Sequence, residues 1–242
     1  MKSRITRRAV ASALSHWGAQ PLSEKAFDAL GEMRVRDLRG RRLPDSAYSF
    51  HGEPISAKLR QLELAETESL WYGRDFHGYV QRMRWFAGQH PPKAGERVVE
   101  IGCGLGATCL MGKHFHPKAL FRGFDTNEYL IQKARLLRRR AGVKGVAFDS
   151  STTNTAVRAA SVDQVWLESP VDLASRLIES GRILKPGGVV KIAASVLEQG
   201  GVSMPKAERD IARLGFRVVR ASVRLVNGKP MAFIVARKEP RR

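Results

Sequence analysis

The strongest constraint on the fold is a regular alternation of short apolar runs with helical segments, which begins at Arg97. Each apolar run is followed by glycine, acidic or other turn-forming residues before the next segment starts. Such alternation is typical of a parallel sheet with helices on both faces. The predicted strands are 98–101, 120–124, 143–148, 164–167 and 189–193, and the predicted helices include 127–140, 173–184 and 206–214.

Two further β segments, 216–226 and 231–236, close the chain and are separated by the pair Asn227-Gly228. An Asn-Gly pair readily adopts the positive φ angles that a tight hairpin turn requires. The sequence therefore predicts an α/β protein with a Rossmann-like, doubly wound, mostly parallel sheet and a C-terminal antiparallel hairpin.

Residues 1–95 lack the alternating pattern of strands. Segments 56–70 and 72–86 have apolar residues at helical spacing, and 90–95 contains two prolines and a glycine, as expected of a linker. We therefore expect an N-terminal helical lid and substrate-binding region at 1–95, and a core domain at 96–242.

Composition excludes several classes of protein. No apolar run approaches the roughly 18 residues that a membrane-spanning helix needs. Two cysteines, Cys103 and Cys109, cannot form a disulfide framework, and their spacing matches no zinc site. The pair Arg7-Arg8 superficially resembles an export signal, but the apolar stretch after it is too short. We expect a cytoplasmic protein with no metal site and no membrane partner.

Charge is the unusual feature of the composition, because 42 Lys and Arg against 23 Asp and Glu give a net charge of +19. An excess of this size attracts polyanions through counterion release. The two densest basic clusters, 34–42 and 133–144, contain no aromatic residue on which a base could stack. The pattern favours a solvated basic surface, with a nucleic-acid interface as the alternative.

The first predicted strand ends in the glycine-rich turn Gly102-Cys-Gly104-Leu-Gly106-Ala107. Gly102 permits the tight turn, Gly104 lets a ligand approach the backbone, and Gly106 lets the next helix pack closely. In an open parallel sheet, ligands bind beyond the carboxyl ends of the strands. The turn also fits the dinucleotide fingerprint in its G-x-G-x-x-A form, so by itself it leaves the ligand open.

Three carboxylates at strand ends favour a cationic adenosine ligand over a dinucleotide. Glu100 precedes the turn, where it would repel a pyrophosphate and attract an ammonium or a sulfonium. Asp125 ends the second strand, where it could accept hydrogen bonds from both ribose hydroxyls. Asp149 ends the third strand, where it could accept a hydrogen bond from the exocyclic amine of an adenine.

With these residues in place, segment 98–192 resembles the class I S-adenosylmethionine-dependent methyltransferases. Val98-Val-Glu-Ile-Gly-Cys-Gly-Leu-Gly106 is similar to their first motif, and Gly123-Phe-Asp-Thr126 to their ribose-binding acidic loop. Phe148-Asp-Ser150 is similar to their adenine-binding turn, and Arg182-Ile-Leu-Lys-Pro-Gly-Gly188 to the turn before their fifth strand. The resemblance implies S-adenosylmethionine as cofactor, with Thr126 and Ser150 beside the three carboxylates and the three glycines in its site.

The end of the fourth strand faces the reacting methyl group in the family that the chain resembles. Here the sequence is Trp166-Leu-Glu168-Ser-Pro170, without the Asn-Pro-Pro-aromatic sequence of the DNA and protein-amide methyltransferases. It resembles the ubiquinone, tocopherol and sterol methyltransferase branch, but lacks the Glu-His pair usual there. Glu168 is a candidate general base or cation stabiliser, and the alternative is a charge at the N-terminus of the next helix.

The end of the N-terminal region offers further candidates. Tyr72 or Arg74 could bind the methionyl carboxylate, and His77 could act as a base, with aromatic packing onto the sheet as the alternative for each residue. Methyl transfer draws much of its acceleration from proximity and orientation, so an indispensable catalytic side chain is not required.

The sequence indicates three functions. The leading one is methyl transfer from S-adenosylmethionine to oxygen, nitrogen or carbon of a small organic acceptor, as in metabolite or natural-product methylation. The alternatives are an RNA methyltransferase that uses the basic surface, and a methyltransferase-like binding module that has lost turnover.

Overall fold

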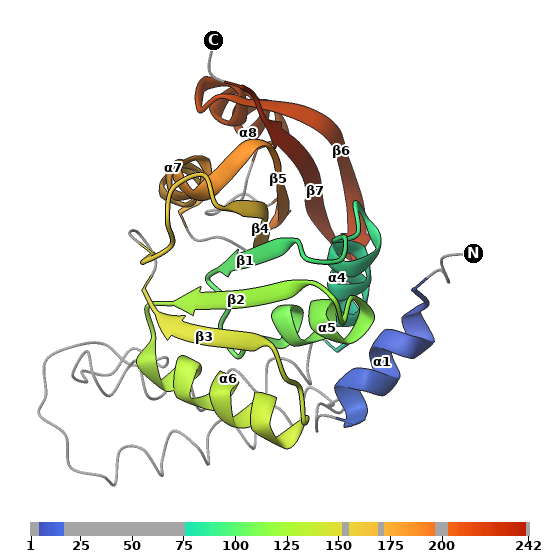
Figure 1. Ribbon diagram of the computed structural model, residues 1–242. Helices are drawn as coiled ribbons and strands as arrows, with labels where there is room; N and C mark the ends of the chain where they lie inside the picture. The colour runs from blue at the N-terminus through green and yellow to red at the C-terminus, as the bar shows by residue number, and fades with distance from the viewer. Residues whose placement is uncertain (1–4, 17–75, 152–154, 169–171, 197–202, 241–242) are drawn as a thin grey trace, which may run out of the picture.

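The computed structural model describes residues 5–16, 76–151, 155–168, 172–196 and 203–240. Their centre is a seven-stranded sheet of order β3-β2-β1-β4-β5-β7-β6 (Figure 1). The strands are β1 (Arg97–Ile101), β2 (Leu120–Asp125), β3 (Val146–Ser150), β4 (Val162–Glu168), β5 (Leu184–Ser195), β6 (Phe216–Val226) and β7 (Lys229–Lys238).

The sheet is parallel from β3 to β5 and antiparallel where β7 pairs with β5 and β6. Asn227 and Gly228 have φ angles of 51° and 72°, as the hairpin turn requires. The predicted mixed sheet with its C-terminal hairpin is confirmed. Strand order reverses between β1 and β4, which makes their carboxyl ends the switch point where ligands bind in such sheets.

Helices cover both faces of the sheet. One core cluster joins the sheet to α4 (Phe76–Gly88), α5 (Ala107–Phe115) and α6 (Glu128–Arg140). A second cluster on the opposite face joins it to α7 (Leu173–Ile183) and α8 (Met204–Arg213). The arrowheads of β1, β2 and β3 point to one side of the molecule, and α1 (Arg7–His16) lies toward the other (Figure 1).

The described helices of the N-terminal region pack onto the core. Aromatic residues of α4 contact the sheet, with the Phe86 ring 5.5 Å from Trp166 and the Trp85 ring 5.0 Å from Phe233. Helix α1 packs beside α4 and α5 through a third apolar cluster, which includes Val10. The helix expected at 56–70 lies outside the described residues, and the division of the chain at residue 95 stays a prediction.

A buried lysine joins α4 to the sheet. The Lys191 side chain on β5 is fully buried, and its Nζ donates a hydrogen bond of 2.8 Å to the Phe86 carbonyl near the end of α4. The ammonium also lies 4.5 Å from the centre of the Trp166 ring. Burial lowers the pKa of Lys191 well below its ordinary value.

Two predicted boundaries differ from the structure. Strand β3 begins at Val146 instead of 143, because Gly142 and Gly145 have φ angles of 64° and 74° that interrupt an extended strand. Strand β5 begins at Leu184, before the predicted turn Lys185-Pro-Gly-Gly188. The pairing with β4 shifts from Val162↔Leu184 to Gln164↔Val189, so this turn is a bulge within the strand.

Among the described residues, the structure contains no helix that is both long and apolar enough to cross a membrane.

Candidate cofactor-binding site

The glycine-rich turn connects β1 to α5 and is tied to β2. Gly102, Gly104 and Gly106 have φ angles of 81°, 49° and 74°, which only glycine adopts readily. The Gly102 N–H donates a 2.7 Å hydrogen bond to the Phe124 carbonyl. A Cβ at Gly106 would lie 2.3 Å from the Phe148 ring, so this position also needs glycine for space. The turn thus has a fixed conformation at the carboxyl edge of the sheet, with Gly102 partly exposed.

Asp125 lies beside this turn at the end of β2. Its Oδ2 accepts a 3.0 Å hydrogen bond from the Gly104 N–H, and its Oδ1 accepts one of 2.9 Å from the Asn127 N–H. The side chain of Asn127 in turn caps α6 by accepting from the N–H groups of Tyr129 and Leu130. Asp125 is only partly buried, and each carboxylate oxygen can accept a further hydrogen bond. The geometry brings Asp125 and the glycine turn together.

The remaining predicted residues of β2 and β3 lie at the same edge. Thr126 and Ser150 are exposed, and Ser150 pairs in register with Asp125. Asp149 pairs with Phe124, so its side chain leaves the opposite face of the sheet from that of Asp125.

Asp149 is occupied by arginines. Its Oδ2 lies 2.7 Å from Nε of Arg122, and its Oδ1 lies 3.6 Å from Nη2 of Arg135. The Asp149 side chain is 37% exposed and retains capacity for another donor. Its assignment to the adenine amine stays a prediction.

Glu100 is buried beneath the turn, with 1% of the residue exposed. Its Oε2 accepts a 3.1 Å hydrogen bond from the Cys109 N–H in the first turns of α5. Burial, and then the negative charge of Glu168, raise the pKa of Glu100 well above its ordinary value. Its carboxyl group connects β1 to α5.

Glu168, at the end of β4, forms a buried cluster with two other elements. Its Oε1 lies 2.7 Å from Nε of Arg82 on α4, and its Oε2 accepts a 2.6 Å hydrogen bond from Oγ1 of Thr108 on α5. The side chains of Arg82 and Glu168 are only 7% and 11% exposed. Both oxygens of the predicted base are therefore engaged by protein groups.

The alternative interpretation of Glu168, a charge capping the next helix, is wrong. The N-cap of α7 is Asp172, whose Oδ1 accepts a 3.2 Å hydrogen bond from the Ser175 N–H. Hydrogen bonds from Ser175, first from its side chain and then from its backbone N–H, lower the pKa of Asp172. Asp172 is four residues beyond Glu168, where the chain has left the sheet and the backbone donors of α7 begin.

The candidates from the N-terminal region are placed only in part. Tyr72 and Arg74 lie outside the described residues. His77 is an exposed residue in the first turn of α4, whereas Arg82 of the same helix contacts Glu168.

Sequence reasoning missed three residues around the turn: Arg82, Thr108 and Arg176. Arg82 and Thr108 hold Glu168, and the guanidinium of Arg176, on α7, packs against Gly102. The sequence alone gives little indication of their roles, because Arg82 is one of many arginines and Thr108 is an ordinary helix residue. The arrangement of β1, β4 and the helices after them is needed to bring these residues together.

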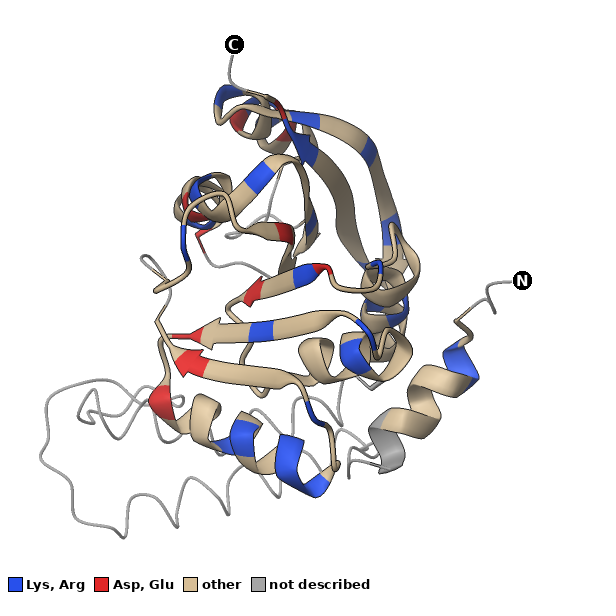
Figure 2. Ribbon diagram, in the orientation of Figure 1, with Lys and Arg blue, Asp and Glu red and all other residues tan. Residues whose placement is uncertain are grey.

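The acidic residues mark this edge of the sheet. Figure 2 shows acidic segments at the ends of β1, β2 and β3, while basic segments are spread over α1, α6 and β6.

No group of three or more potential metal ligands occurs in the described ranges. Cys103 and Cys109 are both buried thiols. Burial and the nearby Glu100 carboxyl raise the pKa of Cys109 well above its ordinary value.

Solved structures with the same fold include several enzymes. The [4+2]-cyclase SpnF is 13% identical over 91% of this chain and 97% of its own, with a TM-score of 0.59. Geranyl diphosphate methyltransferase, in complex with S-adenosylmethionine, is 14% identical over 80% of this chain and 97% of its own, with a TM-score of 0.58. A putative methyltransferase in complex with the Trm112 activator from Haloferax volcanii is 17% identical over 71% and 96%, with a TM-score of 0.59.

The identities are low, and one of these neighbours is a cyclase, so these likenesses concern the fold and leave the acceptor open. The family is shown by sequence. The family described as "Methyltransferase domain" matches residues 92–214, just over half of the chain, from the linker before β1 through the whole of α8. That span contains the glycine turn, Asp125, Asp149 and Glu168, and the chain belongs to this methyltransferase domain family.

Proposed function

We propose that the protein is an S-adenosylmethionine-dependent methyltransferase that acts on a small organic acceptor. The observation that carries the proposal is the position of Asp125, held by the Gly104 N–H beside the glycine turn. A partly exposed carboxylate there suits the two hydroxyls of a ribose. Geranyl diphosphate methyltransferase, which shares the fold, is known in complex with S-adenosylmethionine.

The residues of the turn fit this cofactor in chemical type. In our proposal, the backbone of Gly102, Gly104 and Gly106 lies against the ligand, and Asp125 accepts from the ribose. Thr126, Asp149 and Ser150 line the adenosine end. Glu100 supports the turn from below, since its Oε2 accepts from the α5 backbone. When bound, the cofactor supplies a methyl group on a sulfonium.

The chain's own contribution is chiefly orientation. Displacement at a sulfonium needs an acceptor held in line, and fixed geometry can supply much of the rate enhancement. We propose that Glu168 contributes to this by fixing α4 and α5 through Arg82 and Thr108. In this role it needs no proton transfer. His77 stays a candidate base for an acceptor that must lose a proton.

Charge placement supports a small acceptor over RNA. The glycine turn lies at the carboxyl edge of the sheet, beside the acidic strand ends (Figure 2). An arginine-lined groove of about 800 Å³, which includes Arg84, Arg220 and Arg224, also has Pro91 and His116 in its lining. Those two residues lie just before β1 and just after α5, at the amino ends of the strands. A polyanion in that groove would lie at the edge opposite the glycine turn.

The test combines binding with turnover. Calorimetry should show binding of S-adenosylhomocysteine at micromolar Kd, about −8 kcal/mol, and no tight binding of NAD. Methyl groups labelled in S-adenosylmethionine should pass to compounds in a small-molecule extract, and not to RNA. Tight NAD binding without S-adenosylhomocysteine binding would contradict the cofactor. Cofactor binding without transfer to any fraction would favour a binding module.

The RNA alternative has its own measurement. A generic basic surface should bind RNA weakly and without sequence preference, and binding should vanish between about 50 and 200 mM salt. Nanomolar, salt-resistant binding of one RNA, together with its methylation, would replace the small acceptor in the proposal.

A further inference from the structure

Arg176, near the start of α7, extends toward the glycine turn. The guanidinium packs directly on Gly102, since a Cβ at Gly102 would lie 2.3 Å from Nη1 and 2.8 Å from Cζ of Arg176. Nη1 is buried and has no hydrogen-bond partner among the residues that the structure describes. A charged donor therefore lies buried at the first glycine of the turn.

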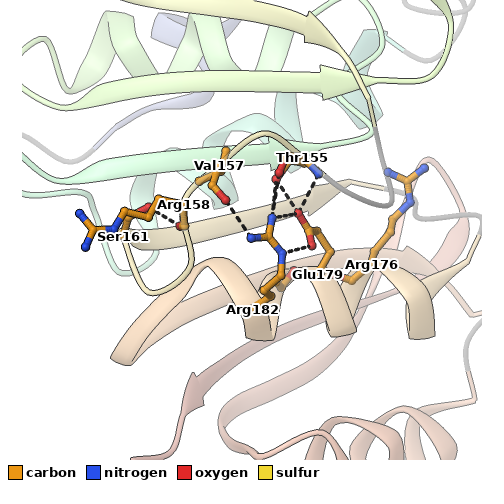
Figure 3. A network of polar contacts seen from close by, with 8 residues as sticks. Thr155, Val157, Arg158, Ser161, Arg176, Glu179 and Arg182 are labelled. Atoms are coloured by element: carbon orange, nitrogen blue, oxygen red, sulfur yellow. Dashed lines mark hydrogen bonds and ion pairs between the residues drawn. The ribbon is translucent and has the colours of Figure 1, made fainter.

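The other arginine of α7 shows what a satisfied guanidinium looks like (Figure 3). Arg182 donates to both carboxylate oxygens of Glu179, at 2.7 and 2.6 Å, and to the carbonyls of Thr155 and Val157. It thereby fastens α7 to the segment before β4. In the same view, Arg176 points away from this network, so the two arginines serve different ends of the helix.

An unpaired guanidinium nitrogen in a buried position is costly, because arginine stays charged and loses its hydration. Asp172, four residues before Arg176, interacts with it through its charge, but no described carboxylate accepts a hydrogen bond from Nη1. Glu168 is bound by Arg82 and Thr108, and Asp125 accepts two backbone N–H groups. Among the described residues Nη1 thus lacks an acceptor, and an anion that arrives with a ligand would supply one.

The position of Arg176 indicates which part of a ligand would carry this anion. Gly102 comes directly after β1 and α7 comes after β4, so the guanidinium lies at the switch point between these two strands. Asp125 lies at the end of β2, on the other side of β1. A ligand with its ribose at Asp125 would extend its opposite end toward Arg176.

We propose that Arg176 binds the methionyl carboxylate of the cofactor across Gly102. The inference rests on the proposed function, whose cofactor carries its one carboxylate at the end remote from the adenine. A guanidinium matches a carboxylate in shape and charge and can donate to both of its oxygens. The absence of a Cβ at Gly102 provides the space in which the two groups meet.

The test compares two ligands that differ only in this carboxylate. Calorimetry is done with S-adenosylhomocysteine and with its decarboxylated analogue, which keeps the nucleoside, the sulfur and the amine. Arg176→Met should lower the affinity for S-adenosylhomocysteine about tenfold or more, and the affinity for the analogue by less than about twofold. Arg176→Lys keeps the charge and should recover part of the loss. Arg209→Met, on the exposed surface of α8, is the matched control and should change neither affinity.

Each other result overturns the inference. Equal weakening of both ligands would mean that Arg176 only supports the turn, and unchanged S-adenosylhomocysteine affinity in a folded Arg176→Met protein would mean that its anion is another one. Thermal unfolding of each variant shows that it is folded. If the wild-type protein binds neither ligand, the proposed function itself fails, and that result is distinct from the first two.

Discussion

The four strand-end carboxylates of the sheet form two contrasting pairs. Glu100 and Glu168, on the adjacent strands β1 and β4, are buried and hydrogen-bonded to protein groups from α4 and α5. Asp125 and Asp149, on β2 and β3, are partly exposed at the edge of the sheet. All four come from the same type of position in the sequence, yet the Asp149 side chain is 37% exposed and that of Glu168 only 11%.

The two pairs differ because different segments cover the ends of their strands. Helix α5 returns over β1, and α4 packs beside it, so side chains at the ends of β1 and β4 meet helix residues. Beyond β2 and β3 the carboxylates meet backbone N–H groups or arginines near the surface. We infer that Glu100 and Glu168, the inner pair, stabilise the arrangement of helices. Asp125 and Asp149, the outer pair, serve the ligand. Substitutions at Arg82, Asp125 and Glu100 test this division.

The largest effect is expected from Arg82→Met, which leaves Glu168 buried next to Glu100 without its cation. Removal of one partner of a buried ion pair costs about 3 kcal/mol or more of unfolding free energy. The Arg82 guanidinium also stacks on the Tyr79 ring at 4.2 Å, and that contact is lost too. Urea denaturation measures the change.

The double variant Arg82→Met/Glu168→Gln is the control for this charge effect. It should be less destabilised than the sum of the single changes, because the unpaired carboxylate is gone. Glu168→Gln alone should cost stability while keeping most turnover. A Glu168→Gln protein of wild-type stability whose kcat falls about 100-fold would instead make Glu168 a general base.

The next effect concerns the outer pair. Asp125→Ala should lower the affinity for S-adenosylhomocysteine about tenfold or more, because the ribose hydrogen bonds are lost. Calorimetry measures this change. Asp163→Ala is the matched control, since Asp163 also accepts a backbone N–H, from Arg97 at 2.9 Å, but lies at the start of β4. It should leave the affinity unchanged. Equal affinity losses in both variants would mean that Asp125 acts only through stability.

The smallest effect is a change in pH dependence in Glu100→Gln. The pKa of Glu100 is raised in the folded protein, chiefly by burial and also by Glu168. Its stabilising contribution is therefore present below the pKa of the unfolded chain and is lost as pH rises through the folded pKa. Relative to wild type, Glu100→Gln should therefore gain stability as pH rises from about 5 to 8.

Thermal unfolding across this pH range checks that expectation. S-adenosylhomocysteine affinity should change by less than about threefold, because the inner carboxyl faces α5. A parallel pH dependence in the two proteins would show that Glu100 ionises as readily folded as unfolded. A tenfold loss of affinity would return Glu100 to the ligand, as its place before the glycine turn first indicated.

The contrast between the pairs also explains how far sequence reasoning reached. Strand ends, the glycine turn and the Asn227-Gly228 hairpin are local signals, and the sheet built on them is confirmed. Burial of Glu100 and the partners of Glu168 depend on how helices from distant parts of the chain pack. Arg82 and Glu168 are 86 residues apart. No spacing rule links such residues, and one arginine among many carries no mark of its role.

The two backbone hydrogen bonds to Asp125 have a consequence for affinity itself. A side chain that must be immobilised when a ligand binds costs about 0.5–1.5 kcal/mol of entropy. Asp125 is already fixed by the N–H groups of Gly104 and Asn127, so this ordering takes place during folding. Preorganisation of the ribose acceptor therefore depends on the turn between β1 and α5 and on the start of α6. Substitutions that loosen either segment should weaken ligand binding even where they touch no ligand atom.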